Sequence, residues 1–529
     1  MRVNYNELNL AYQAISDIVF LKDKNLWIIF SQENESYYFG AFYNFYSRPF
    51  KFIHKIFLPK IKEINILNSK EAIFDSNNNS FYLKVFNDEI EIKCLNFDEI
   101  RIILDANFIF NANPFLRKIK IERINSNFLH VLFIFENKLI LESVFESSSP
   151  LNFFENWERF DLNFDKKRNS KFQEFWYLNG IETKSNFLRI KILNQQSPKE
   201  NLFFNYTNNN YYNFLISRLN ALIINNYLPA GFPWFYENWF RDELISFYLL
   251  KNFLNYNFKP RYFSNFKDWM FLNKPNGFEA SDTFLWFLIN LDKNDYDVYQ
   301  KLIKEYLEKW ENRYLKENLL NLPPKTTWMD TLERKEALEI YALYLKTLRN
   351  LAKLDNFYKE KANFYFNLLK NKVNEIFDVN LIFVYLLIPD LFEKKEWLDL
   401  FDKLIKNFYL LWGGISSKKI NEENFYQNHT GENPLSYHCG DSWYYLNNLL
   451  ALCLFLLDRK KYNEIISKII LSSLEDLLKD GVLGYSSELS SAQIRKSEGS
   501  LIQTWSIASL LFLLFSFQDF DIFFKSLSD

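Results

Sequence analysis

Five loop segments hold most of the residues that could do chemistry, because they combine tryptophans with acidic side chains, glycine and proline. They are residues 230–235 with 239–242, 280–287, 327–330 with 337–343, 437–443, and 486–489 with 503–506. Breaking a glycosidic bond requires one protonated carboxyl as acid and one ionised carboxylate as base or nucleophile. Flat tryptophan rings offer stacking faces for sugars, and the Arg241-Asp242 pair can fork onto vicinal hydroxyls. The segments therefore indicate glycoside hydrolysis.

Few other kinds of catalytic site are compatible with the sequence. It contains four histidines, His54, His130, His429 and His438, and no pair has the helical spacing of metal ligands. A Gly-rich phosphate loop, a nucleophile elbow and a Cys-x-x-Cys motif are all missing. We therefore expect no metal and no cofactor, and a metal site at His429, His438 and Cys439 is only a minor alternative.

The charge balance limits the class of partner. The chain carries 63 Lys and Arg against 65 Asp and Glu, a formal charge of -2, so it offers no strong field to nucleic acid or to an anionic membrane. We expect neither of these partners, and a neutral ligand fits better. The three cysteines are scattered and the N-terminus lacks a signal-peptide pattern, so the cytoplasm is the expected location.

One apolar stretch resembles a membrane span. Residues 500–517 carry no charge over 18 positions, the minimum length for a transmembrane helix. Gln503, Thr504 and Trp505 lie in its first third and would be costly in hydrocarbon. We therefore expect a buried helix, with a membrane anchor as the alternative.

The elements that must position the five segments change character along the chain. From residue 25 to about 193, apolar residues alternate in short runs such as 89–94, 116–121 and 128–135, which predicts strands. Asn179-Gly180, between residues 175–177 and 187–192, is typical of a hairpin turn. We expect an antiparallel β-sandwich domain over residues 1–195.

After about residue 200 the apolar period becomes helical, as in residues 299–314. Similar stripes occupy residues 209–224, 242–256, 278–290, 335–353, 357–377, 395–408, 440–457, 461–479 and 500–517. One stripe stops at Asp480-Gly481, where glycine could take left-handed geometry. Residues 196–529 are therefore expected to form an all-helical domain of stacked hairpins, and periodicity alone does not distinguish a closed ring from a solenoid.

The five segments resemble, in the same order, signature elements of the C-terminal domain of glycogen debranching enzymes, the amylo-α-1,6-glucosidase family. Residues 230–242 resemble its Ala-Gly-Tyr-Pro-Trp-Phe and Trp-Gly-Arg-Asp elements, and residues 327–330 and 338–340 its Thr-Trp-Met-Asp and Val-Glu-Ile. Residues 437–443 resemble its Tyr-His-x-Gly-(Thr/Ser)-Val-Trp, and 487–488 with 503–506 its Ser-Glu and Gln-Ala-Trp-Ser. The similarity runs from about residue 228 to 510.

This resemblance implies an (α/α) toroid of six hairpins, related to glucoamylases, that hydrolyses α-glucan oligo- or polysaccharides with inversion. It implies release of glucose from the α-1,6 branch stubs of glycogen-type glucans, with Asp330 as general acid and Glu488 as general base. It also implies a set of sugar-binding residues, namely Trp234, Arg241, Asp242, Asp282, Trp328, Glu339, His438 and Trp443. Phe240 and Tyr341 depart from the family's Gly and Asn, which leaves the linkage preference open.

The surroundings of the two carboxyls suggest different pKa values. We expect Trp328 and Met329 to raise the pKa of Asp330, and the serines around Glu488 to keep that side chain ionised. The structural alternatives are an Asp330 that only caps a helix, a Glu488 on the surface, and an Arg241-Asp242 pair that is only an ion pair. His438 could equally be a buried imidazole with its hydrogen bonds satisfied.

Two other functions are compatible with the sequence. A glucoamylase-like or trehalase-like exo-hydrolase of α-1,4 or α,α-1,1 glucosides would use the same acid and base. A carbohydrate-binding protein without catalysis is the alternative of a different class. No alternation of strands and helices predicts the (β/α) barrel that carries the transferase of some debranching enzymes, so we expect an enzyme that depends on another to trim the branch first.

Overall fold

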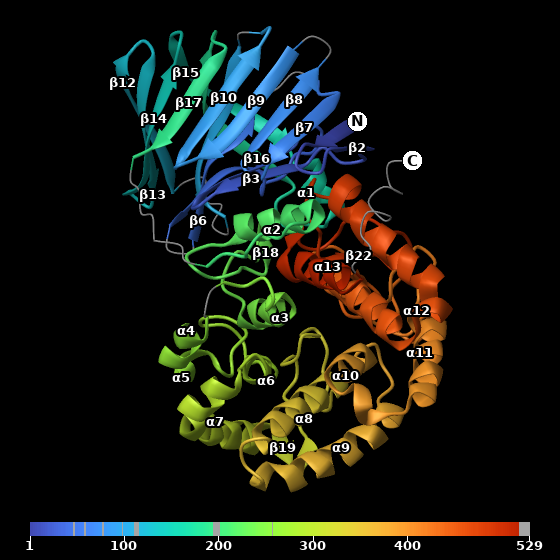
Figure 1. Cartoon of the computed structure of the whole chain (residues 1–529). Helices are drawn as coiled ribbons and strands as arrows, with labels where there is room; N and C mark the ends of the chain where they lie inside the picture. The colour runs from blue at the N-terminus through green and yellow to red at the C-terminus, as the bar shows by residue number, and fades with distance from the viewer. Residues whose placement is uncertain are drawn as a thin grey trace.

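The computed structural model describes residues 1–45, 48–57, 60–76, 79–97, 99–109, 116–193, 202–255 and 258–517. Strands dominate these ranges up to Ile192, and helices dominate from Asn210 onward. The strand-rich region lies at one end of the molecule and the helical region at the other (Figure 1). The domain boundary predicted between residues 195 and 196 lies outside the described residues.

The strand-rich region consists of two sheets. In spatial order the first contains β12 (Arg117–Asn125), β13 (Phe128–Phe135), β14 (Lys138–Ser147), β17 (Phe187–Ile192), β10 (Glu89–Leu95), β9 (Asn79–Phe86), β8 (Glu71–Ser76), β7 (Glu63–Asn68), β1 (Arg2–Tyr5) and β2 (Leu10–Gln13). The second contains β15 (Leu151–Asp161), β16 (Glu174–Thr183), β11 (Ile100–Phe108), β6 (Arg48–Ile56), β5 (Gly40–Phe45), β4 (Leu26–Phe30) and β3 (Val19–Asp23). Neighbouring strands are antiparallel except β1 and β7, which are parallel.

Aromatic side chains join the two sheets face to face. The ring of Phe133 on β13 lies 5.9 Å from that of Phe52 on β6, and Phe74 on β8 lies 5.2 Å from Phe30 on β4. The inward side chains of both sheets are therefore buried together, as in a β-sandwich. A β-sandwich followed by a helical region is the coarse architecture that the sequence predicted.

The hairpin predicted at Asn179-Gly180 is wrong. Both residues lie inside β16, where Gly180 pairs with Phe154 of β15 and with Ile103 of β11. β16 and β17 belong to different sheets, so the chain crosses between sheets after Thr183. Gly180 is required for space, because a Cβ there would lie 2.0 Å from the tip of the Phe154 ring.

Most helices occupy the predicted stripes. The helices described after residue 202 are α2 (Asn210–Leu222), α3 (Phe240–Leu250), α4 (Lys259–Ser264), α5 (Phe266–Trp269), α6 (Thr283–Ile289), α7 (Lys293–Tyr314), α8 (Leu338–Ala352), α9 (Phe357–Glu375), α10 (Leu381–Leu387), α11 (Lys394–Phe408), α12 (Tyr444–Glu475) and α13 (Thr504–Phe517). The backbone of Asp458 is not helical, so α12 is two helices joined at a kink. Outside the predicted stripes lie α4, α5 and α10, together with the short α1 (Asn163–Lys167) in the strand-rich region.

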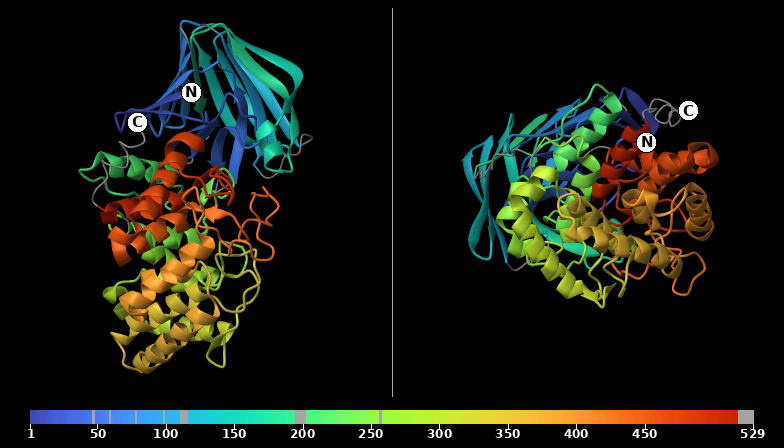
Figure 2. Two further views of the ribbon diagram at one scale, coloured as in Figure 1. Left: turned by 90° about the vertical axis from the view of Figure 1, so that its right-hand side faces the viewer. Right: turned by 60° about the horizontal axis from the view of Figure 1, so that its bottom comes forward.

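Six of these helices contact one another in a cycle. α3 packs on α6, α6 on α8, α8 on α10, α10 on α12, α12 on α13, and α13 returns to α3. With the lower end turned forward, the helical region runs from green through yellow and orange to red around the molecule (Figure 2, right). The complete toroid of six hairpins goes beyond these contacts and stays a prediction.

Two local predictions in the last part of the chain have different outcomes. Residues 504–517 form α13, most of whose side chains are buried. Within the described part of the chain, no helix is long and apolar enough to cross a membrane. Gly481 follows the helical turn at Asp476–Asp480 with a φ of -96°, so the left-handed geometry expected there is wrong.

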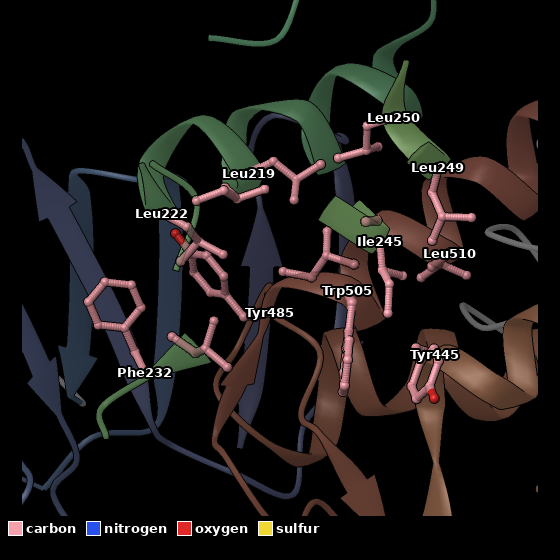
Figure 3. Packing of buried hydrophobic residues seen from close by; sticks show 14 of the residues in the cluster. Leu219, Leu222, Phe232, Ile245, Leu249, Leu250, Tyr445, Tyr485, Trp505 and Leu510 are labelled. Carbon is pink, nitrogen blue, oxygen red and sulfur yellow. The ribbon is translucent and has the colours of Figure 1, made fainter. Parts of the chain in front are cut away.

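The two regions share one buried core. Leu219 and Leu222 of α2 pack near Tyr485 and Phe232 (Figure 3). From the sandwich, the ring of Phe20 lies 5.1 Å from that of Phe232 and 5.3 Å from that of Tyr485. The strand-rich region is thereby held against the loops that precede α3 and α13.

The close packing on Gly180 makes a stability prediction. Gly180→Ala should lower the free energy of unfolding by about 1 kcal/mol, at the low end for overpacking because the tip of the Phe154 ring can move. The loss should largely disappear when Phe154→Ala is also present. Urea denaturation of the two single variants and the double variant measures this coupling, and an equal loss in both backgrounds would contradict it.

Candidate active site

A pocket of about 470 Å³ lies where the predicted segments meet. Seven predicted site residues line it: Trp234, Arg241, Asp242, Trp328, Asp330, Trp443 and Glu488. The aromatic wall is completed by Phe235, Trp239, Tyr437 and Trp505. The structure therefore brings together residues that are separated by up to about half the chain.

Two short β-ladders join the segments. β18 (Gly231–Phe232) pairs with β23 (Ile502–Gln503), and β21 (Ser442–Trp443) pairs with β22 (Leu489–Ser490). The first ladder sets the loop that carries Trp234 beside the start of α13. The second sets Trp443 beside the loop that carries Glu488. Backbone hydrogen bonds thus fix which carboxyls face the same space.

Arg241 links two of the predicted acidic residues. Its Nε donates to Oδ2 of Asp282 at 2.7 Å, and its Nη1 lies 3.7 Å from Oδ2 of Asp330. Asp282 stands at the N-cap position of α6, but its side chain makes no capping hydrogen bond there. The ion-pair partners of Arg241 are therefore Asp282 and Asp330, and the structural alternative of an Arg241-Asp242 ion pair is not found.

Asp330 projects into the pocket, with 34% of its side chain exposed. It does not cap a helix, because the next helix, α8, begins eight residues later at Leu338. Burial raises the pKa of Asp330 to about 6, nearby Arg241 opposes this rise, and Asp282 adds to it. The predicted direction of this shift is confirmed.

Glu488 is 2% exposed and its carboxylate accepts two hydrogen bonds. The Tyr437 hydroxyl donates to Oε1, and the backbone N–H of Ser500 donates to Oε2 at 2.7 Å. Burial raises the pKa of Glu488 to about 7, although these two donors oppose the rise. The expectation of an unraised pKa among serines is wrong, because Ser487 donates to Asp476 and Ser490 to the carbonyl of Ile494.

Asp242 is a third carboxyl in the same pocket. Gln503 Nε2 donates to its Oδ1 at 3.4 Å. Burial raises the pKa of Asp242 to about 8; Arg241 lowers it, and the charges of Glu488 and Asp330 raise it further. At neutral pH the carboxyl of Asp242 is therefore mostly protonated.

Three predicted binding residues lie behind the pocket wall. Asp282 is held by Arg241, and Glu339 accepts hydrogen bonds from Arg334. His438 stacks on Trp443 with ring centroids 5.1 Å apart, and burial lowers its pKa well below the usual value. None of these three side chains lines the pocket itself, and each contacts a residue that is part of the wall or close to it.

The strand-rich region supplies a part of the wall that no sequence motif predicted. Tyr38 and Arg168 line the pocket, and both contact Trp234. The guanidinium of Arg168 lies 4.2 Å from the centroid of the Trp234 ring, and the ring of Tyr38 lies 5.1 Å from it. The loop residues His429, Gly431, Glu432 and Pro434 were also missed. None of them lies in a tryptophan-rich or acidic motif, so no local signal identifies them.

The raised pKa of Asp242 predicts a pH-dependent penalty on stability. The folded state holds the proton up to pH about 8 and the unfolded state only to its ordinary value of 3.8, so stability falls as pH rises between these values. Asp242→Asn should therefore raise the free energy of unfolding above that of wild type by an amount that grows from pH 5 to pH 8, at most about 1.4 kcal/mol per pH unit. Thermal melts across this range measure the effect, with exposed Asp297→Asn as baseline. A gain that is the same at both ends would contradict it.

Comparison with known proteins gives one family match. Residues 378–512 match the model of the family described as Amylo-alpha-1,6-glucosidase. This range contains the segments at 437–443, 486–489 and 503–506. No curated protein matches the chain.

Two of the solved structures that match this chain are distant from it. A family GH92 alpha-mannosidase from Bacteroides thetaiotaomicron is 9% identical, with a TM-score of 0.37, over 95% of this chain and 82% of that one. An uncharacterized conserved protein from Thermus thermophilus is 11% identical, with a TM-score of 0.25, over 43% of this chain and 55% of that one. Similarity this low carries no functional argument.

The family match agrees with the resemblance of the sequence motifs and supports an enzyme that acts on glycosides. The resemblance to glycogen debranching enzymes is thereby confirmed over residues 378–512, which match the family described as Amylo-alpha-1,6-glucosidase.

Proposed function

We propose that this chain is an inverting α-glucan hydrolase that releases glucose from the α-1,6 branch stubs of glycogen-type glucans. The observation that carries the proposal is that the carboxyls of Asp330 and Glu488 line one tryptophan-walled pocket. Its volume, about 470 Å³, lies within the range of pockets that hold small ligands. The α-1,6 linkage rests on the family matched by residues 378–512.

In this proposal Asp330 is the general acid and Glu488 the general base. Asp330 donates its proton to the leaving oxygen, and Glu488 activates a water on the opposite face of the sugar ring. Arg241 and Asp242 hold the glucose that is released, and Trp234, Trp328 and Trp443 offer it stacking faces.

The different exposure of the two carboxyls supports these roles. With pKa values of about 6 and about 7, both carboxyls titrate near neutral pH, and without substrate Glu488 holds a proton more readily than Asp330. A bound sugar would displace water from Asp330, which is 34% exposed, and raise its pKa further. Glu488 is already buried and keeps two donors that favour its ionised form. The proposed roles therefore require that substrate binding raise the pKa of Asp330 above that of Glu488.

The architecture proposed for this enzyme is a β-sandwich domain over residues 1–195 and a six-hairpin toroid over 196–529. The cycle of α3, α6, α8, α10, α12 and α13 supplies the inner ring. Contacts of α9 with α8, α2 with α13 and α11 with α12 support an outer layer. A cytoplasmic α-glucan store is the proposed substrate, and neither a metal nor a cofactor takes part.

The proposal predicts a substrate preference that separates it from the alternatives. The purified protein should release glucose from a dextrin with single α-1,6-linked glucose stubs faster than from a linear maltodextrin or from trehalose. Preference for maltodextrin or trehalose would favour the exo-hydrolase alternative, and no release from any of them would favour a binding protein. Proton NMR should detect β-glucose first, and α-glucose as the initial product would exclude inversion.

The assigned roles predict different responses of two variants to the leaving group. On the branched dextrin, Asp330→Asn and Glu488→Gln should each lower kcat by about 10² to 10⁴, the usual effect of losing proton transfer. On α-glucosyl fluoride, whose leaving group needs no proton, Asp330→Asn should recover most of its rate. Glu488→Gln should not recover, because its water still lacks a base.

Two controls make this comparison interpretable. Circular dichroism and binding of a non-hydrolysed sugar should be unchanged in both variants. Recovery of Glu488→Gln alone on the fluoride would mean that the two roles are exchanged.

A further inference from the structure

One peptide group connects the strand-rich region to Glu488. The peptide between Gly499 and Ser500 donates its N–H to Oε2 of Glu488 at 2.7 Å. The carbonyl of the same peptide accepts a hydrogen bond from Nη1 of Arg168, also at 2.7 Å. Arg168 therefore acts on one end of the peptide dipole and Glu488 on the other.

We infer that Arg168, contributed by the strand-rich region, is a positioning residue for Glu488 and acts through the Gly499–Ser500 peptide. This inference rests on the proposed function. A cation at the carbonyl polarises the peptide and strengthens its N–H as a donor, since hydrogen bonds in a chain reinforce one another. The arginine thereby favours the ionised form of Glu488, which is the form that a base requires.

The peptide can approach Glu488 this closely only because residue 499 is glycine. Gly499 has a φ of +67°, a conformation that side chains with a Cβ rarely adopt. A Cβ at this position would lie 2.4 Å from Oε2 of Glu488. The backbone here is built around the carboxylate.

Arg168 is held rigidly at the border of the two regions. It follows α1 (Asn163–Lys167) as the C-cap residue, is 7% exposed, and lies over the ring of Trp234. Its carbonyl accepts the backbone N–H of Glu432 at 3.0 Å. Gly431 permits this contact, because a Cβ there would lie 2.0 Å from the Arg168 carbonyl oxygen. The loop of the helical region is therefore fitted to this arginine.

Buried polar contacts within the sandwich fix the segments around Arg168. Asp165, one turn earlier, accepts the Ser36 hydroxyl at 2.7 Å and the Tyr37 N–H at 2.6 Å. The ammonium of buried Lys51 donates to the carbonyl of Tyr37 at 2.6 Å. These contacts hold Tyr38 and Arg168, the two residues of this region that line the pocket, in one place.

The charged and titratable groups that face Glu488 come from three parts of the chain. Arg168 lies on the sandwich side, Tyr437 and His429 on the loop before α12, and Asp242 on α3. Among them the positive charge of Arg168 lowers the pKa of Glu488. The negative charge of Glu488 in turn raises the pKa of Asp242. Loss of Arg168 should therefore raise the pKa of Glu488.

The test is the pH dependence of kcat/KM in Arg168→Gln. If the arginine lowers the pKa of Glu488, the variant should be about tenfold slower than wild type at pH 5, where fewer molecules hold an ionised base, for each unit of pKa elevation. The deficit should shrink as pH rises and vanish at pH 9. A deficit that is the same at every pH would mean that Arg168 only supports the fold, and would overturn the inference. Arg168→Met, which keeps an unbranched side chain on Trp234, serves if Arg168→Gln does not fold.

Arg218→Gln is the matched control. Arg218 is also buried and also bridges the two regions, through an ion pair with Glu7, but it lies on α2. Its loss should leave the pH dependence of kcat/KM unchanged.

A second measurement does not depend on turnover. The ¹³C NMR titration of the Glu488 carboxyl, assigned by its loss in Glu488→Gln, should show a higher pKa in Arg168→Gln than in wild type. If wild type released no sugar, the proposed function would fail, while this titration would still decide whether Arg168 acts on Glu488. An identical pKa in the two proteins would overturn the inference.

Discussion

The confinement of Asp242, Asp330 and Glu488 in one mostly apolar pocket is the constraint on which the rest of the site depends. Burial raises the pKa of Asp242 to about 8, of Glu488 to about 7 and of Asp330 to about 6. A charge in such surroundings persists only where a cation or a hydrogen-bond donor compensates it. Arg241 does this for Asp330, and the Tyr437 hydroxyl and a backbone N–H do it for Glu488. The ionised forms of Asp330 and Glu488 are thus stabilised by different groups.

The fold places these cations and donors beside the carboxyls by joining loops that are distant in sequence. The ladders β18–β23 and β21–β22 contain only two residues per strand, yet they connect the loops before α3 and α12 to those around Glu488 and α13. Backbone hydrogen bonds of this kind do not depend on side-chain type. The core shared by the sandwich and the helices, with Phe232 and Tyr485 between them, then fixes where the sandwich adds its own groups.

The sequence predicts features that depend on neighbouring residues, and it does not predict features that depend on contacts between distant segments. Alternating and helical periods located most strands and helices, but α10 was missed because its seven residues are uniformly apolar and have no stripe. The hairpin predicted at Asn179-Gly180 is wrong because Gly180 is needed to leave space for the Phe154 ring and not to allow a positive φ in a turn. Asp330 and Glu488 were found through motifs, whereas the raised pKa of Glu488 depends on burial by segments far along the chain.

Sequence motifs identify side chains, whereas Arg168 of the strand-rich region acts on Glu488 through a backbone peptide group. Its contribution therefore has no signature in the sequence. The group that contacts Glu488 at residue 500 is a backbone N–H, which any residue except proline provides. The Ser500 hydroxyl itself is directed to the carbonyls of Phe232 and Ile502. Only Gly499 is constrained by this geometry, and one glycine is too common to signal it. A region without any catalytic motif can therefore set the ionisation of a residue that has one.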